Sequence, residues 1–341
     1  MNAERFKQIT GRYGQLRLAV LGDFCLDRYL EIDPTRRETS IETGLPVHNV
    51  VKVRGQPGGA GTILNNLVAL GIGIIYPVGF VGEDGEGFEL RRALAAGLSV
   101  RLDFFLQSDQ RRTFTYCKPL VIEAGQPPAE LNRLDSKNWT ATPPAVEAEL
   151  KRAVEKIAER VDAIILLDQV DLPNTGVVTD GVLQTVDQVA RARPELLIIA
   201  DSRRGLLDFP PVTYKMNVAE LGRLARHAEA KDLGALRRKA VALARLNQQR
   251  VFVTLAERGI LGAEPGGAIE HVPALPVRGE IDIVGAGDAV TANLAAALAA
   301  GGGTREALEL ASAAASIVIH QLGTTGTASV RQIGELLECA C

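Results

Sequence analysis

The stretch Asp282-Ile283-Val284-Gly285-Ala286-Gly287-Asp288 lies between an apolar, β-prone segment and an alanine-rich stretch with helical character. Two glycines and an acid therefore fall where a loop becomes the first turn of a helix. Gly285 and Gly287 let backbone N–H groups converge without an intervening Cβ, and the positive end of the helix dipole adds to their attraction for anionic oxygens. The carboxylate of Asp288 stands where it can accept the proton of an attacking hydroxyl. The pattern predicts phosphoryl transfer, with Gly285, Ala286 and Gly287 as an anion-binding turn and Asp288 as the general base.

The same stretch has a second interpretation that needs no ligand. A glycine turn followed by an acid is also an ordinary helix N-terminus, because a carboxylate there is favoured by the helix dipole. The rest of the chain has to separate the two interpretations.

The composition is that of a globular protein with a large core. Of 341 residues, 46% are hydrophobic and 23% are charged, and the net charge is −3. This size and composition fit one large domain over residues 1–341. The balance of charge predicts no general affinity for nucleic acid or for an anionic membrane, so an anion site has to be built locally. With no signal-type apolar block and no metal-ligand spacing among the cysteines, we expect a cytoplasmic protein with reduced thiols.

Short apolar strands alternate with helical patterns along most of the chain. This alternation predicts an α/β fold, with a mainly parallel sheet and helices on both of its faces. The expected strands are Leu16–Leu21, Ile72–Phe80, Ala163–Leu167, Leu196–Ala200 and Arg250–Leu255. The expected helices are Ile63–Leu70, Glu86–Ala96, Ala145–Arg160, Val178–Arg191 and Asp232–Leu246.

Two segments break this alternation, residues 29–54 and residues 111–133. Both are rich in threonine, valine and charged residues in short alternations. Such patterns are typical of exposed strands, and we expect a small antiparallel β-sheet that projects from the main sheet as a lid.

Polar residues follow the expected strands of the main sheet. They are Asp23, Asp168, Asp201, Thr254 and the loop that contains Asp282. Ligand sites of open parallel sheets lie beyond the carboxyl ends of the strands, so these residues predict one site at one edge. Taken singly, each is also explained as a helix cap or a turn residue.

With these pieces in order, the chain resembles the PfkB carbohydrate kinase family, which has the ribokinase-like fold, over residues 18 to 337. The motif Gly22-Asp23-Phe24-Cys25-Leu26-Asp27 is similar to the first-strand motif of that family. The resemblance implies that Asp23 and Asp27 hold hydroxyl groups of a sugar. Without the family, these acids are a helix cap and a surface charge.

The segment 57–62 is similar to the di-glycine hinge of the family. The resemblance implies that Gly58, Gly59, Thr62 and Asn66 contact the substrate. The family usually has asparagine at the position of Thr62, which affects one hydrogen bond to the sugar. A Pro-Gly-Gly turn before a helix is the ordinary explanation of the same residues.

The resemblance also implies a nucleotide side of the site. Asn217-Val218-Ala219-Glu220 is similar to the Asn-x-x-Glu motif, in which Asn217 and Glu220 organise Mg²⁺ and phosphate through water. An asparagine cap with glutamate at the third helical position is the alternative. The segment 254–259 resembles the loop that binds ATP, which assigns Thr254, Glu257 and Gly259 to the nucleotide.

A monovalent cation such as K⁺ is implied beside the anion-binding turn. Asp282 and the carbonyl group of Val284 would line its site. The family usually has threonine where this chain has Ile283.

Within the family, the first lid segment and residues 311–327 are most similar to the kinases of heptose 7-phosphate. The chain departs from them at two strand ends. It has Gln169 in a segment without lysine, and Asp201-Ser202-Arg203-Arg204 where those kinases have Asp-Pro-Lys. A phosphorylated substrate needs a cationic clamp. The cations available for it are Arg36, Arg37, Arg111, Arg112, Lys118, Arg203 and Arg204.

The sequence therefore predicts an ATP-dependent kinase of a sugar or sugar phosphate. Two alternatives remain open, namely a fructose-, ribose- or nucleoside-type kinase and a sugar-binding regulator without catalysis. Because lid strands have open edges, we also expect a homodimer that pairs them.

Overall fold

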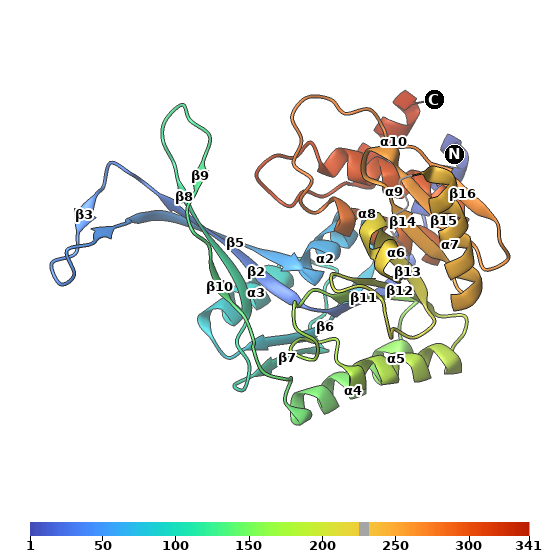
Figure 1. Ribbon diagram of the computed structural model, residues 1–341, viewed down its shortest axis with the longest axis horizontal. Coiled ribbons are helices and arrows are strands. Elements are labelled where there is room, and N and C mark those ends of the chain that lie inside the picture. Colours follow the sequence, from blue (N-terminus) through green and yellow to red (C-terminus); the bar gives the residue numbers. More distant parts are fainter. Residues whose placement is uncertain (225–231, 341) are drawn as a thin grey trace.

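The computed structural model describes residues 1–224 and 232–340 of the chain. Within them, the main sheet has nine strands in the order β16-β15-β14-β13-β12-β11-β1-β6-β7 (Figure 1). Neighbouring strands from β14 to β7 are parallel, whereas β15 and β16 add to one edge in antiparallel fashion. The prediction of a mainly parallel sheet is confirmed. The strands are β1 (Arg17–Gly22), β6 (Ile74–Gly82), β7 (Phe105–Ser108), β11 (Ala163–Asp168), β12 (Leu197–Ser202), β13 (Thr213–Asn217), β14 (Val251–Thr254), β15 (Ile260–Ala263) and β16 (Ile269–Val272).

Helices cover both faces of this sheet (Figure 1). One face carries α1 (Ala3–Thr10), α2 (Ala60–Ala69), α3 (Gly85–Ala95), α8 (Ala286–Ala299), α9 (Thr304–Val318) and α10 (Val330–Ala340). The other face carries α4 (Pro144–Ala158), α5 (Asp180–Ala192), α6 (Val218–Leu224) and α7 (Leu233–Asn247). In the part of the chain described, none of these helices has the length and apolar character needed to cross a membrane.

The central strand β1 shows why a strand has a continuous apolar sequence when its sheet is covered on both faces. Leu18 and Val20 point into the core under α2 and α8, while Ala19 and Leu21 point into the core under α4 and α5. All four side chains are fully buried. Because successive side chains of a strand face opposite sides, both parities have to be apolar here.

The predicted helices and strands of the main domain all occur, with ends shifted by a few residues. Strands β7, β13, β15 and β16 were not predicted. One further expectation is wrong, because the segment before Asp282 is an irregular loop and not the end of a strand. Strand β16 ends at Val272, and Pro273 and Pro276 follow it. Proline has no N–H group to donate to a ladder, which favours the end of the strand at this point.

The lid is a second sheet that leaves the main domain as a long arm (Figure 1). Its strand order is β10-β8-β2-β5, with β9 beside β8. Its strands are β2 (Phe24–Ile32), β5 (Val50–Gly59), β8 (Phe114–Val121), β9 (Ala129–Glu130) and β10 (Leu134–Ser136), and the tip holds β3 (Glu38–Thr39) and β4 (Pro46–Val47). The strands extend beyond the predicted segments, because β2 follows Asp23 directly.

The expected antiparallel pairing of the lid is only partly correct. Strand β2 is antiparallel to β5, and β8 is antiparallel to β10, but β2 and β8 are parallel. The reason is that β2 follows β1 and β8 follows β7, and these two strands point toward the same edge of the main sheet. Both lid strands therefore leave that edge in the same direction.

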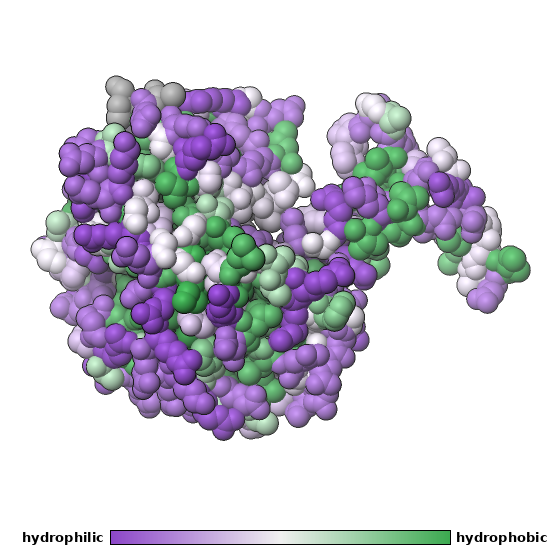
Figure 2. Space-filling model, turned by 180° about the vertical axis from the view of Figure 1, so that it is seen from behind, coloured by the Kyte–Doolittle hydropathy of each residue, from purple (hydrophilic) through white to green (hydrophobic). Residues whose placement is uncertain are grey.

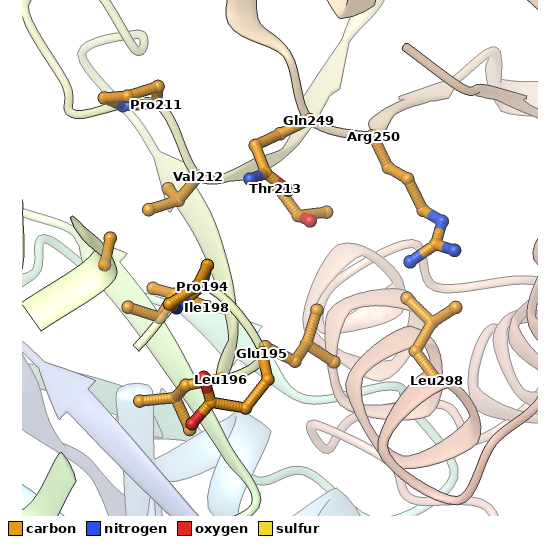
Figure 3. A pocket seen from close by; sticks show the side chains of 12 residues that line it. Pro194, Glu195, Leu196, Ile198, Pro211, Val212, Thr213, Gln249, Arg250 and Leu298 are labelled. Atoms are coloured by element: carbon orange, nitrogen blue, oxygen red, sulfur yellow. The ribbon is translucent and has the colours of Figure 1, made fainter. Parts of the chain in front are cut away.

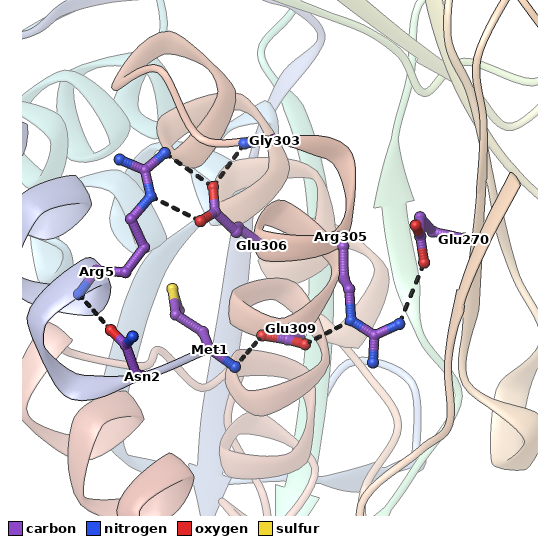
Figure 4. A network of polar contacts seen from close by, with 8 residues as sticks. All are labelled: Met1, Asn2, Arg5, Glu270, Gly303, Arg305, Glu306 and Glu309. Atoms are coloured by element: carbon purple, nitrogen blue, oxygen red, sulfur yellow. Dashed lines mark hydrogen bonds and ion pairs between the residues drawn. The ribbon is translucent and has the colours of Figure 1, made fainter. Parts of the chain in front are cut away.

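Ion pairs tie the N-terminus to α9 (Figure 4). The ammonium group of Met1 lies 2.6 Å from Glu309, and the Arg5 guanidinium lies 2.6 Å from Glu306. Arg305 continues the network to Glu270 of β16 at 3.2 Å. This network lies on α1 and α9, away from the polar strand ends of the main sheet.

Candidate active site

The polar strand ends of the main sheet meet the N-terminus of α8 and the base of the lid. Asp168 ends β11, Asp201 is the residue before the last of β12, and Asn217 and Thr254 end β13 and β14 as direct neighbours across the ladder. The expected edge is therefore formed. Asp282 reaches it from the loop before α8 and not from a strand.

The anion-binding turn has the predicted local geometry. Gly285 is the N-cap of α8, and its φ of 83° and ψ of −8° are left-handed values that favour glycine. Helix α8 begins at Ala286, whose N–H group donates to the carbonyl group of Ile283 at 3.2 Å, and the N–H groups of Gly287 and Asp288 have no acceptor within the helix. A turn of this kind offers converging donors to an anion. The assignment of a phosphoryl group to this turn stays a prediction.

Asp288 lies in the first turn of α8, as expected for a base beside this turn. Burial raises the pKa of Asp288 to about 7, Lys215 lowers it, and the charges of Asp201 and Asp27 raise it. A carboxyl group with this pKa can be ionised at neutral pH and still be basic enough to take a proton from a hydroxyl group.

Lys215 is the residue of this region that the sequence analysis missed. Its side chain is buried, and its Nζ lies 2.6 Å from Oδ2 of Asp201, which also accepts a 3.2 Å hydrogen bond from Thr291. Nζ would lie 3.2 Å from a Cβ placed on Gly287. Burial lowers the pKa of Lys215, but the Asp201 carboxylate offsets this and the net shift is upward. A lysine inside an apolar strand, two residues before Asn217, was the available signal.

Asn217 and Glu220 form a reciprocal capping box at the start of α6. The Glu220 carboxylate accepts from the N–H of Asn217 at 2.7 Å, and the Asn217 side chain accepts from the N–H of Glu220 at 2.9 Å. The ordinary interpretation of this motif is therefore realised. In the described residues, no three acidic, histidine or cysteine side chains gather as a metal cage. Carboxylate and amide oxygens of this pair fit a magnesium ion that is held through water.

On the acceptor side, Asp27 is buried in β2 opposite Gln56 of β5. Burial raises the pKa of Asp27, while Lys118 and Arg133 lower it. The di-glycine turn is shaped by close contacts to the two acids. A Cβ on Gly58 would lie 2.5 Å from Oδ2 of Asp27, and a Cβ on Gly59 would lie 2.5 Å from the carbonyl oxygen of Asp23. Gly59 also has a positive φ of 57°.

The Asp23 carboxylate holds the loop after β11 in place. It accepts hydrogen bonds from the N–H groups of Gln169 at 2.8 Å and Val177 at 2.7 Å. Burial and the Asp168 charge raise the pKa of Asp23 to about 7, against the effect of these amides. The structure thus shows a positioning role for Asp23, and its predicted contact with a sugar stays a prediction.

Two further residues that were predicted to contact the substrate lie on successive turns of α2. Thr62 is buried with its methyl group 3.6 Å from a Cβ placed on Gly285, so it packs against the anion-binding turn. Asn66 is fully buried one turn further along and donates a 3.0 Å hydrogen bond to the carbonyl group of Thr62. Asn66 therefore stabilises helix α2 from within the core.

Most of the cations proposed for a phosphate clamp have acidic or hydroxyl partners elsewhere. Arg111 is buried against Thr140, Thr142 and Thr175, and Arg204 lies 2.8 Å from Asp168. Arg36, Arg112 and Arg203 pair with Asp33, Asp84 and Asp171, and Arg37 is exposed on the arm. Of this set, only Lys118 influences the pKa of Asp27, and Arg133, which the set omitted, does so as well.

The remaining nucleotide-side residues lie at the end of β14. The Thr254 hydroxyl group donates a 3.4 Å hydrogen bond to the carbonyl group of Met216, and Glu257 is exposed in the short 3₁₀ turn that follows. A Cβ on Gly259 would collide with the backbone of Val272 and Pro273, so the packing of the fold is enough to require glycine at this position. On the cation side, the Asp282 carboxylate accepts from the N–H of Val284 at 3.0 Å.

A cavity of about 200 Å³ lies at the opposite ends of β12 and β13 (Figure 3). Its lining includes Leu197 and Thr213, the first residues of these strands, and Arg250 just before β14. The cavity is therefore separated from the anion-binding turn by the length of the sheet and is a different feature.

The mainly parallel sheet covered on both faces, with a small second sheet beside it, is the architecture of the ribokinase-like fold. A family model described as pfkB family carbohydrate kinase matches residues 17–331. The chain belongs to the PfkB family of carbohydrate kinases.

Relatives and solved structures agree with this family. The chain is 31% identical over 308 residues to the bifunctional protein HldE of Azorhizobium caulinodans, covering 90% of this chain and 61% of that protein. It is 30% identical over 338 residues to the bifunctional protein HldE of Syntrophotalea carbinolica, covering 99% and 66%. The chain thus spans less than two thirds of the length of these two relatives.

Two solved structures show the shared fold. Arabidopsis thaliana ribokinase complexed with ribose and ATP is 19% identical, with a TM-score of 0.67 and coverage of 95% of this chain and 99% of that one. Escherichia coli phosphofructokinase-2 in complex with substrates and products is 18% identical, with a TM-score of 0.71 and the same coverage.

Proposed function

We propose that the protein transfers a phosphoryl group from ATP to a hydroxyl group of a sugar phosphate, with heptose 7-phosphate as the first candidate acceptor. The observation that carries the proposal is the position of Asp288. It lies beside the anion-binding turn and within electrostatic reach of both Lys215 and Asp27. A base between an anion site and an acidic acceptor site is what transfer to a hydroxyl group requires.

In the proposed reaction, Asp288 takes the proton of the attacking hydroxyl group. The N–H groups of the turn, together with the Lys215 ammonium, stabilise the charge on the transferred phosphoryl oxygens. Asp201 holds that ammonium in place before ATP binds, and the Thr291 hydroxyl group donates to the same carboxylate. A bound magnesium ion would neutralise phosphate charge, and Asn217 and Glu220 would hold it through water.

The lid supplies the acceptor side of the proposal. Asp27 binds a hydroxyl group of the sugar, and the lid closes over it to keep water from acting as the acceptor. Lys118 and Arg133 both act on the charge of Asp27, so we assign them to a phosphate already on the sugar, for which Arg133 would exchange its 2.6 Å ion pair with Asp135. The likeness of the lid segment to the heptose-phosphate kinases supports this acceptor.

One observation favours a second candidate, a kinase of a neutral sugar. The segment at Gln169 has no lysine, and the Arg204 guanidinium beside it is neutralised by the buried Asp168 carboxylate. If no cation reaches the acceptor, a free sugar is the better substrate. The two candidates differ only in the acceptor.

The test is a comparison of kcat/KM for matched pairs of free and phosphorylated sugars, heptose and hexose included, with MgATP. We expect a preference for the phosphorylated member of at least one pair. Equal or reversed preference would favour the neutral-sugar kinase. Absence of transfer to every acceptor, with ATP and sugar still bound in a thermal-shift assay, would favour a binding protein without catalysis.

A monovalent cation is a smaller part of the proposal. It would lie beside Asp282 and the carbonyl group of Val284, in a loop that is tied to Ile319 by a 2.8 Å backbone hydrogen bond. Replacing K⁺ with a larger organic cation at constant ionic strength should lower kcat. An unchanged kcat would remove this element and leave the rest of the proposal intact.

The proposal includes a homodimer that forms through the lid. Strands β5 and β10 are edges of the lid sheet, and within the described residues no further strand pairs with their outer backbone groups. Apolar side chains gather on the arm (Figure 2), and the exposed ones include Ile41, Leu45, Val50, Val51, Val53, Ile122 and Leu134. A second copy of the chain would cover both the edge and these side chains.

The oligomeric state tests this part. We expect the mass in solution to be that of two chains, and the double variant Val51→Lys, Val53→Lys to be monomeric. Leu98→Lys is the matched control, because Leu98 is 94% exposed on the main domain. A monomeric wild-type protein would reject the dimer.

A further inference from the structure

The lid strand β5 is joined to a loop near the C-terminus by the side chain of Gln56. Its Nε2 donates a 2.7 Å hydrogen bond to the Thr325 hydroxyl group, and its Oε1 accepts a 3.3 Å hydrogen bond from the Thr324 hydroxyl group. Both ends of one amide are therefore used on two consecutive threonines. Gln56 also lies directly opposite Asp27 in the β2–β5 ladder.

The loop that receives Gln56 is braced from within. Gln321 donates a 2.7 Å hydrogen bond to the carbonyl group of Thr327 and accepts one of 3.1 Å from its N–H group. Gly326 fits beneath this side chain, since a Cβ there would lie 2.6 Å from Oε1 of Gln321. The loop 321–327 is thus a closed ring before any ligand binds, and it can serve as a fixed support.

The same loop touches the anion-binding turn. The Cβ and methyl group of Thr325 lie 3.6 Å from a Cβ placed on Gly285. The segment that precedes the loop holds the approach to that turn, because the carbonyl group of Ile319 accepts from Asp282 and the His320 ring accepts from the N–H of Arg278 at 2.8 Å. Thr325 therefore lies between the lid and the anion-binding turn and contacts both.

We propose that Gln56, Thr324 and Thr325 form a latch that positions the lid acid Asp27 against the anion-binding turn. The three residues touch neither reacting group, so they are positioning residues. The latch sets the distance between acceptor and base, and it keeps the lid closed while the phosphoryl group moves. The inference rests on the proposed phosphoryl transfer for its kinetic consequences, but not for its structural ones.

Two single variants and their combination test the latch by kinetics. Thr325→Val keeps the shape of the side chain and removes the hydroxyl group, while Gln56→Met removes the amide. Each should lower kcat/KM for the acceptor about fivefold, the scale of one neutral hydrogen bond, and leave the KM for ATP within about twofold. Gln56→Met also breaks the contact with Thr324, so it should lose at least as much as Thr325→Val. The double variant should lose no more than Gln56→Met, because both changes remove the shared contact between Gln56 and Thr325.

If the latch is lost and water enters under the lid, ATP hydrolysis should increase relative to transfer. A purely structural role of the latch would not produce this change. The ratio of ATP hydrolysis without acceptor to transfer with acceptor should rise about fivefold in Thr325→Val. Thr325→Ser retains the hydroxyl group and should restore the wild-type ratio. Thr10→Val is a remote control, since the Thr10 hydroxyl group bonds only within α1, to Phe6.

Hydrogen exchange decides the structural part independently of activity. In the free protein, Thr325→Val should speed exchange in two segments together, residues 50–59 of the lid and residues 283–288 of the anion-binding turn. Faster exchange in the lid alone, or additive losses in the double variant, would overturn the latch. If no sugar is phosphorylated, the proposed function fails, and the exchange result still accepts or rejects the latch.

Discussion

The main-sheet end of the site and the lid differ in how deeply their charged side chains are buried. Lys215 is buried between Asp201 and the anion-binding turn, with its partner 2.6 Å away. Lys118 and Arg133 lie 5.0 Å from the ring centres of Tyr29 and Tyr116. The Arg133 side chain is 45% exposed and pairs with Asp135 at 2.6 Å near the surface. Buried charges are screened little by salt, whereas exposed ones lose much of their effect.

This difference assigns different tasks to the two regions. Charges that are fixed before a ligand binds cost no reorganisation when charge develops, which suits the chemical step. Exposed cations above aromatic rings can adjust to a ligand, which suits recognition of the acceptor. Changes at the main-sheet end should therefore alter kcat, and changes on the lid should alter the choice of acceptor.

The largest effect is expected at Asp288. Asp288→Asn should retain the fold and ATP binding and lower kcat by about 10²-fold or more, the scale of a general base. In the wild-type protein, kcat should fall as the pH drops below about 7, because burial raises the pKa of Asp288 to about 7 and the protonated acid cannot take a proton. A variant with near-normal kcat would remove Asp288 from the mechanism.

At Gly287, the size of the introduced side chain should decide the effect. A Cβ there would lie 3.2 Å from Nζ of Lys215. Gly287→Val should lower kcat/KM for ATP about tenfold more than Gly287→Ala, because a β-branched side chain crowds the turn further. Near-normal activity of Gly287→Val would mean that no phosphate approaches this turn.

On the lid, Lys118→Met and Arg133→Met should each lower kcat/KM for a phosphorylated sugar about tenfold, since charge-assisted hydrogen bonds are the stronger kind. The loss should shrink at high salt, and the free sugar should be unaffected. Arg152→Met, on the exposed side of α4, is the control. Equal losses for free and phosphorylated sugars would place these cations outside phosphate recognition.

The metal side should give a smaller effect. Glu220→Gln should raise the Mg²⁺ concentration for half-maximal rate more than it raises the KM of the sugar. Glu306→Gln makes the same change at the N-terminus of α9, where Glu306 accepts from the N–H of Gly303 at 2.8 Å. If both variants show the same Mg²⁺ dependence as the wild type, Glu220 is a helix cap alone.

The smallest effect is on stability against pH. Burial raises the pKa values of Asp23 and Asp288 to about 7, above those of an unfolded chain. Between about pH 4 and 7 the folded state then binds more protons, so the free energy of unfolding falls as the pH rises. Asp288→Asn should flatten this slope in urea unfolding series. A slope that is unchanged would show that Asp288 is not perturbed.

Much of the fold was predictable because it depends on local patterns. The helical period over residues 145–160 and the apolar run of residues 163–167 each appear within a few residues of the predicted bounds. The turn at Gly285 was predictable for the same reason, since a left-handed residue before a helix favours glycine. Strand β13 was missed because Lys215 interrupts its apolar pattern.

What the sequence alone determined is the alternation of the central helices and strands, the glycine turn before α8, and the acids near the strand ends, because these are properties of neighbouring residues. Only the tertiary structure decided the partners across the chain. Asp201 meets Lys215 because β12 and β13 are adjacent in the sheet, and Gln56 meets Thr325 across 269 positions. The parallel pairing of β2 with β8 likewise depends on which edge of the main sheet both strands leave. Such contacts are set by the packing of the whole chain, and no local pattern carries them.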